Sequence, residues 1–171
     1  RKTNTMMISQ KMADRLSEQV THEFFASYLY QSMAFALEAM SFKGFANWYN
    51  VQAQEEHGHA MRIAKYILDQ GADVKLGALD QPTSKFKSVE EIVSMALAHE
   101  MKVTAQVAEI AALADELKDY ATRKFIDWKV EEQVEEVATA SELLEMVKRC
   151  ESDSQLMLVE SQLKRPAAGG E

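Results

Sequence analysis

Four long segments of the sequence place apolar residues at steps that alternate between four and three. This spacing keeps apolar side chains on one face of an α-helix and is typical of helices that pack in a bundle. The composition agrees, because the chain has 6 Gly and 2 Pro among 171 residues and is rich in good helix formers. We therefore predict an all-α fold whose four long helices span 8–38, 43–71, 88–116 and 119–150.

The lengths of the connections predict how these helices are arranged. The breaks near Ser41 and near Leu117 are short, so the helices on either side of each break should form an antiparallel hairpin. The segment 71–87 between the hairpins is much longer than such neighbours need. At about 3.3 Å per residue it can run the length of a bundle. We therefore expect a four-helix bundle with a long crossover between helices two and three.

The remaining segments are short. After residue 150, Ser152 can cap a fifth helix over 155–164 that ends before Pro166. We expect one domain over 7–165, which includes this helix. We expect residues 1–6 to be a flexible N-terminus and residues 166–171 a disordered tail.

The charge and the cysteine content exclude several classes of protein. With 27 acidic and 19 basic residues the formal net charge is −8, which argues against a nucleic-acid partner. No apolar run approaches the ~20 residues of a membrane helix, so we expect no membrane partner. Cys150 is the single cysteine, which excludes an intrachain disulfide and favours a reducing compartment. We therefore expect a cytoplasmic protein.

Acidic residues interrupt the apolar faces of all four predicted helices, at positions where charged residues are rare unless they are paired. Their spacing repeats between the two hairpins. A shift of 77 residues superposes Glu23, Glu56 and His59 on Glu100, Gln133 and Glu136. Because matched residues of an antiparallel hairpin lie equally far from its turn, we expect all six side chains to converge on one layer in the middle of the bundle.

Such a layer needs positive charge, because buried carboxylates that lie close together repel one another. Lys129 is the one basic residue on these faces, and it lies about 10 Å from Glu136 along the helix axis. We therefore predict that two divalent cations occupy the layer. Oxygen ligands with one imidazole and no thiolate suit iron or manganese better than structural zinc. The alternative interpretation is a polar network that only fixes the register of the helices.

At these residues the chain resembles the ferritin family, and most closely its haem-free prokaryotic type, over residues 7–165. The matching motifs are Glu-Gln-Val-Thr-His-Glu at 18–23, Gln-Glu-Glu-His-Gly-His at 54–59, His-Glu at 99–100 and Glu-Gln-Val-Glu-Glu at 132–136. The resemblance implies a di-iron centre with two irons per subunit. Its ligands would be Glu23, Glu56, His59, Glu100, Gln133 and Glu136.

The resemblance implies further roles. A third iron site would use Glu55, Glu132 and Glu135, and Tyr30 and Trp128 would be redox aromatics close to the di-iron centre. Lys129 departs from the aromatic residue that is common at its position. His57 stands where bacterioferritins have their haem-ligating Met, so we expect no haem. His22 and His99 each precede a ligand Glu and should point away from the centre.

The implied function is iron storage by a ferroxidase. Fe(II) would be oxidised by dioxygen or peroxide and stored as a ferric mineral inside a hollow homo-oligomeric cage, expected to contain twenty-four subunits. Two other classes of protein remain open from the sequence. One is a di-iron oxygenase or peroxidase that acts on an organic substrate, and the other is a structural helical bundle without iron.

Overall fold

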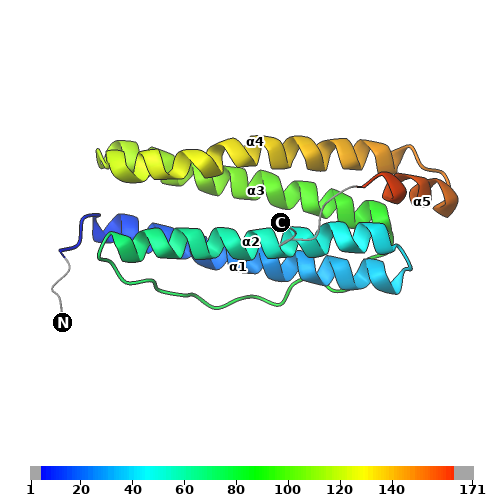
Figure 1. Ribbon diagram of the computed structural model, residues 1–171, viewed down its shortest axis with the longest axis horizontal. Helices are drawn as coiled ribbons and strands as arrows, with labels where there is room; N and C mark the ends of the chain where they lie inside the picture. The colour runs from blue at the N-terminus through cyan, green and yellow to red at the C-terminus, as the bar shows by residue number, and fades with distance from the viewer. Residues whose placement is uncertain (1–4, 164–171) are drawn as a thin grey trace, which may run out of the picture.

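The computed structural model describes residues 5–163 and contains five helices and no strand over that range (Figure 1). Four long helices lie side by side in an elongated bundle, and a short fifth helix packs across one end. They are α1 (Gln10–Ala39), α2 (Lys43–Asp69), α3 (Val89–Glu116), α4 (Tyr120–Lys148) and α5 (Asp153–Gln162). Each predicted boundary lies within two residues of the observed one, and the predicted fold class is confirmed.

Residues 1–4 of the predicted flexible N-terminus and the predicted tail 166–171 lie outside the described residues. At the start of the predicted domain, the Met7 N–H donates to the Gln70 carbonyl at 2.9 Å, just after the end of α2. Within residues 5–163, none of the helices combines the length and the apolar character that a membrane crossing requires.

Polar side chains fix where four of the helices begin. In each case a hydroxyl or carboxylate just before the helix accepts a hydrogen bond from a free N–H of the first turn, which lowers the cost of starting the helix. These caps are Ser9 for α1, Ser88 for α3, Asp119 for α4 and Ser152 for α5. The start of α2 is capped from a distance instead, because Glu160 of α5 accepts from the Gly44 N–H at 2.9 Å.

The ends of the helices carry the turn residues that the short connections require. Ser41 and Lys118 adopt positive φ angles of 68° and 55°, which turn the chain back at the two hairpins. Gly71 follows α2 with φ at 77°. A Cβ at Gly71 would lie 2.9 Å from the Thr5 carbonyl oxygen, so glycine is needed for both its backbone angle and its lack of a side chain.

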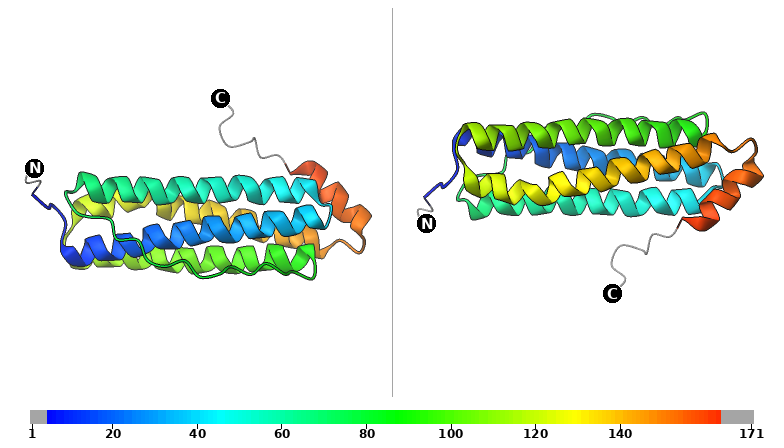
Figure 2. Two further views of the ribbon diagram at one scale, coloured as in Figure 1. Left: turned by 90° about the horizontal axis from the view of Figure 1, so that it is seen from below. Right: turned by 90° about the horizontal axis from the view of Figure 1, so that it is seen from above.

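The crossover between α2 and α3 runs the length of the bundle, from the end at which α2 stops to the opposite end (Figure 1). The left view of Figure 2 shows the same path from another side. Side chains of α1 hold it in place: Ser17 accepts from the Lys75 N–H at 3.2 Å, and Thr21 accepts from the Gly77 N–H at 2.9 Å. The long crossover predicted from the sequence is therefore present.

The apolar core is divided into two clusters. One surrounds Leu37, Phe45 and Ile92, towards the turn between α1 and α2, and the other surrounds Leu16, Ile63 and Ile110, towards the opposite end. Full burial of a large apolar side chain contributes about 1.5–3 kcal/mol, so the two clusters provide most of the driving force for folding. Between them lies a layer of buried polar side chains.

Candidate metal centre

The polar layer draws on all four long helices. Its most deeply buried members are at most 3 % exposed, which is rare for charged residues. They are Glu23 from α1, Glu56 from α2, Glu100 from α3, and Lys129 and Gln133 from α4. His59 and Glu136, which lie one turn further along α2 and α4, are partly buried.

Three of the predicted ligands form the first half of the centre. One ligand atom from each of Glu23, Glu56 and His59 lies within 4.8 Å of the others, and no other trio of His, Cys, Asp or Glu in residues 5–163 is gathered in this way. His59 Nδ1 lies 3.0 Å from Glu56 Oε2 and 3.7 Å from Glu23 Oε2. We name Glu23, Glu56 and His59 the first half-site.

Two amides that we did not single out from the sequence hold the carboxylates of this half-site. Gln19 Nε2 donates to Glu23 Oε1 at 2.7 Å, and Gln52 Nε2 donates to Glu56 Oε1 at 2.9 Å. Each donor lies four residues before its acceptor, on the same face of the same helix. This spacing is visible in the sequence and was a usable signal. Each amide binds Oε1 of its carboxylate, so Oε2 is available to other partners.

The second half-site consists of Glu100, Gln133 and Glu136. Gln133 Nε2 donates to Glu100 Oε2 at 3.0 Å, and the Tyr30 hydroxyl donates to Glu100 Oε1. Glu100 and Glu136 line a cavity of about 20 Å³, which is large enough for about one water molecule. Burial and the nearby Glu56 carboxylate raise the pKa of Glu100 to about 7.

Lys129 corrects one expectation. Its position along the helix suggested that it was too far away to balance the charge of the layer. Its side chain instead reaches into the first half-site, where Nζ lies 3.4 Å from Glu23 Oε2 and 3.7 Å from Glu56 Oε2. Distance along the axis was the wrong measure, because the long side chain carries its charge away from the backbone. At about 4 Å such a pair attracts by about 4 kcal/mol at an effective dielectric of about 20.

The contacts of His59 determine the charge of its ring. Burial would lower the pKa of His59, but hydrogen bonds with Glu132, Glu23 and Glu56 raise the pKa to about 11. Lys129 Nζ lies 2.9 Å from Nδ1 and opposes this rise, because two positive charges at that distance repel. Carboxylates nevertheless face both ring nitrogens, because Nδ1 lies 3.0 Å from Glu56 Oε2 and Nε2 lies 3.1 Å from Glu132 Oε1, and they outweigh this repulsion.

The donor set fits a metal ion. Glu23 Oε2 and Gln133 Oε1 are buried and accept no hydrogen bond, and both atoms belong to predicted ligands. His59 turns Nδ1 towards Glu23 and Glu56 while a carboxylate holds Nε2–H, the arrangement in which histidine usually binds metals. Oxygen ligands with one imidazole suit iron or manganese.

The residues predicted for a third iron site are not gathered as closely. Glu132 is half-buried and bonded to His59, Glu55 is half-buried, and Glu135 is exposed. The third site stays a prediction.

The aromatic residues lie beside the layer. Tyr30 is bonded to Glu100 and stacks on Tyr49, and the ring centroid of Trp128 is 5.4 Å from that of His59. Their redox role stays a prediction. His99 packs edge-on against Tyr30, with 5.7 Å between ring centroids, and burial lowers the pKa of His99 to about 4. It is therefore a neutral packing residue.

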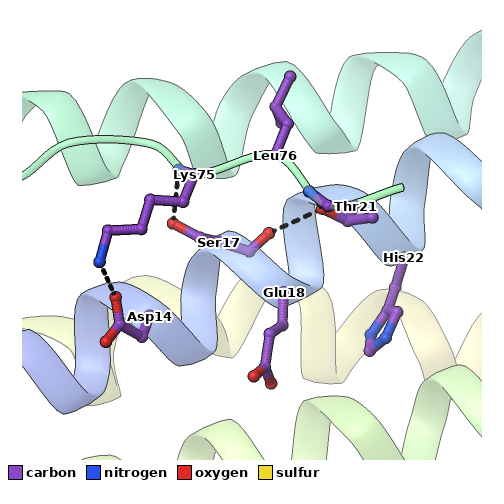
Figure 3. Close-up of a pocket in the computed structure, with 8 residues that line it drawn as sticks. Asp14, Ser17, Glu18, Thr21, His22, Lys75 and Leu76 are labelled. Carbon is purple, nitrogen blue, oxygen red and sulfur yellow. Dashed lines mark hydrogen bonds and ion pairs between the residues drawn. The ribbon is translucent and has the colours of Figure 1, made fainter. Parts of the chain in front are cut away.

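A larger pocket lies away from this layer, between α1 and the crossover (Figure 3). Its volume is about 490 Å³, and an ion pair at 2.7 Å joins Lys75 and Asp14 along its wall. Glu18 and His22 extend away from the crossover segment. The pocket contains none of the predicted metal ligands, so its size does not bear on the metal centre.

The fold and this layer together define a class of protein: a four-helix bundle with a long crossover and an acidic layer that includes a Glu-x-x-His motif, typical of ferritin-like carboxylate proteins. Comparisons with known proteins agree. Residues 13–150 match the family model for the ferritin-like domain. The chain belongs to the ferritin family, and its predicted kinship with the haem-free prokaryotic type is confirmed.

Individual relatives cover almost the whole chain. A bacterial non-heme ferritin of Staphylococcus saprophyticus is 38% identical over 158 residues, which are 92% of this chain and 95% of the relative. The corresponding protein of Staphylococcus aureus strain MRSA252 is 36% identical over the same shares. Among solved structures, an open pore ferritin from Archaeoglobus fulgidus has a TM-score of 0.89 and 37% identity, covering 91% of this chain and 97% of that one.

Proposed function

We propose that this protein is an iron-storage ferritin that oxidises its substrate, Fe(II), at the polar layer and stores the product as a ferric mineral inside a homo-oligomeric cage. The observation that carries the proposal is the buried carboxylate layer, placed between two apolar clusters of a ferritin-family bundle. Membership of a family whose relatives are named non-heme ferritins supports storage of iron without haem.

The two half-sites would each bind one Fe(II). Glu23, Glu56 and His59 would hold one ion, and Glu100 and Glu136 the other, with Gln133 beside it. Glu56 lies between the half-sites, because its carboxylate contacts His59 and also acts on the charge of Glu100. Holding two ions together allows both to be oxidised in one encounter with the oxidant.

The electrons and protons of this reaction balance simply. Two Fe(II) ions lose one electron each and become two Fe(III) ions. Dioxygen gains these two electrons and two protons to form hydrogen peroxide. When peroxide is the oxidant, it gains two electrons and two protons to form two water molecules. Tyr30 and Trp128, which contact Glu100 and His59, would be redox aromatics beside the layer, and the two-electron balance is complete without them.

A cage is supported by the surface of the subunit. Several large apolar side chains are exposed on α1 and on the crossover, including Phe35 at 68 % and Leu76 at 64 %. Apolar groups of this size usually mark interfaces between proteins. We propose a closed cage of 24 subunits of 19.3 kDa each.

The test changes Glu56 and Glu136 to Ala together. We expect fast oxidation of Fe(II) in air, followed by stopped-flow absorbance of Fe(III), to be lost while gel filtration shows the same particle. A control that changes Glu90 and Glu142, both exposed, should oxidise Fe(II) like the unchanged protein. Fast oxidation by the Glu56 and Glu136 double variant would refute the assignment of the centre.

An oxygenase that acts on an organic substrate is less well supported. Such an enzyme needs a substrate pocket beside its metals. The cavity lined by Glu100 and Glu136 has a volume of about 20 Å³. Pockets that bind small molecules are typically about 300–1,000 Å³.

A further inference from the structure

The ammonium group of Lys129 lies where the first half-site would hold its metal ion. Its Nζ is 2.9 Å from His59 Nδ1, 3.4 Å from Glu23 Oε2 and 3.7 Å from Glu56 Oε2. These residues are the three that come close enough together to hold an ion. Lys129 therefore contacts the whole donor set of this half-site with one atom, and its side chain is fully buried.

An ion and this ammonium group cannot share the half-site. Zinc, for example, lies about 2.0–2.2 Å from nitrogen and oxygen ligands, so an ion in this half-site would lie against His59 Nδ1, which Lys129 Nζ now contacts at 2.9 Å. The two positive charges would also repel each other at short range in a site from which water is largely excluded. The first half-site can therefore hold either the Lys129 ammonium group or a metal ion, but not both.

The second half-site has no counterpart of this group. The residue 77 positions before Lys129, which is its equivalent in the other hairpin, is Gln52. Gln52 is neutral and lines the cavity next to Glu100. Among residues 5–163, Lys129 is the only buried lysine or arginine. The two half-sites are therefore related in position but different in charge.

Lys129 has a partner outside the donor set. Glu132 Oε2 lies 3.7 Å from Nζ, and the Glu132 side chain is 31% exposed. A flexible lysine side chain that leaves the half-site can remain paired with this carboxylate, so its withdrawal does not leave the charge unpaired.

We propose that Lys129 is a built-in competitor for metal: its ammonium group fills the first half-site in the metal-free protein, and a divalent cation enters by exchange with it. The second half-site fills first, and the first half-site binds its ion more weakly. This inference rests on the proposed function, because it assumes that the polar layer binds metal.

The test uses Co²⁺, which binds to similar ligands and is not oxidised in air under these conditions. Binding is measured by calorimetry on the assembled protein for the unchanged chain, Lys129→Gln and the control Lys124→Gln. Lys124 lies on the same helix, and its side chain is 86% exposed. We expect Lys129→Gln to bind the second Co²⁺ per subunit at least about a hundredfold more tightly, and Lys124→Gln to match the unchanged chain.

Each result decides between the two proposals. If Lys129→Gln binds each of the two Co²⁺ ions with the same affinity as the unchanged chain does, the proposed competition is wrong. The proposed metal centre is not affected by that result. If the double variant of Glu56 and Glu136 to Ala binds Co²⁺ as the unchanged chain does, the proposed metal centre itself fails, and the role of Lys129 with it.

A second measurement does not depend on the folding of a variant. In a crystal structure of the unchanged protein with Co²⁺, anomalous scattering locates the ions. We expect an ion in the first half-site to be accompanied by withdrawal of Lys129 Nζ from His59 Nδ1. An ion at this position with the 2.9 Å contact still present would overturn the proposal.

Discussion

The two half-sites occupy equivalent positions in the two hairpins, yet their charges are balanced in opposite ways. In the first, burial raises the pKa of Glu23, but His59 and Lys129 outweigh it and the pKa falls below its ordinary value. In the second, Glu100 has neutral partners, and burial and the Glu56 carboxylate raise its pKa to about 7. A repeated backbone arrangement therefore does not impose repeated electrostatics, because one side chain, Lys129 in place of a glutamine, reverses the balance.

The largest expected effect on stability comes from removing the positive charge of Lys129, which distinguishes the two half-sites. Lys129→Met leaves the first half-site with buried carboxylates and no ammonium group. We expect the free energy of unfolding of the metal-free protein to fall by about 3–5 kcal/mol, measured by urea denaturation in the presence of a chelator. Lys124→Met serves as the exposed control. Equal stability of the two variants would mean that Lys129 does not balance the layer.

The next effect concerns the second half-site and depends on pH. The pKa of Glu100 is higher in the folded protein than its ordinary value of 4.5. The contribution of Glu100 to the free energy of unfolding is therefore fully present below about pH 4.5 and is lost as the pH rises through about 7. The loss amounts to about 3 kcal/mol. Glu100→Gln should remove this part of the pH dependence in metal-free protein. Thermal melting between pH 5 and pH 8 checks the difference in slope, and parallel curves would contradict the assignment.

A smaller effect is expected from the amides of the first half-site. Gln19→Leu removes the donor to Glu23 Oε1, a buried hydrogen bond to a charged group at 2.7 Å. We expect a loss of about 2 kcal/mol at neutral pH, measured by chemical denaturation. Gln54→Leu, at an exposed position on α2, should change stability much less. A similar loss at both positions would show that the bond to Glu23 is not the cause.

The smallest effect is expected at Tyr30. Tyr30→Phe removes the hydroxyl that donates to Glu100 and should cost about 1 kcal/mol. This hydrogen bond lowers the pKa of Glu100, so its loss should move the stability decline of metal-free protein to higher pH. Tyr120→Phe is the control, because Tyr120 is 75 % exposed. The prediction fails if both variants give the same pH profile.

The parts of the structure that could be predicted from the sequence are those that depend on backbone position. Apolar spacing fixed the helices, and the length of 71–87 fixed the crossover, because both follow from regular helix geometry. The convergence of the acidic residues followed from matched distances to the turns. The amide donors Gln19 and Gln52 were within reach of the same reasoning, because their spacing of four residues is regular.

The role of Lys129 could not be predicted in this way. A lysine side chain is a flexible stem of four carbons. The position of its backbone therefore leaves the location of its charge undetermined over several ångströms. The burial of His99 against Tyr30 depends in the same way on side-chain packing between helices. The pKa of Glu100 depends on how completely its neighbours exclude water. These features require the tertiary structure.

Each of the two apolar clusters draws side chains from all four long helices. Neither hairpin can therefore complete a cluster alone, and neither end of the bundle can be removed without exposing one. The subunit should consequently open as a single cooperative unit rather than by melting from one end. In hydrogen exchange, the amides of the central turns of α1 and α3 should exchange at similar rates on both sides of the polar layer.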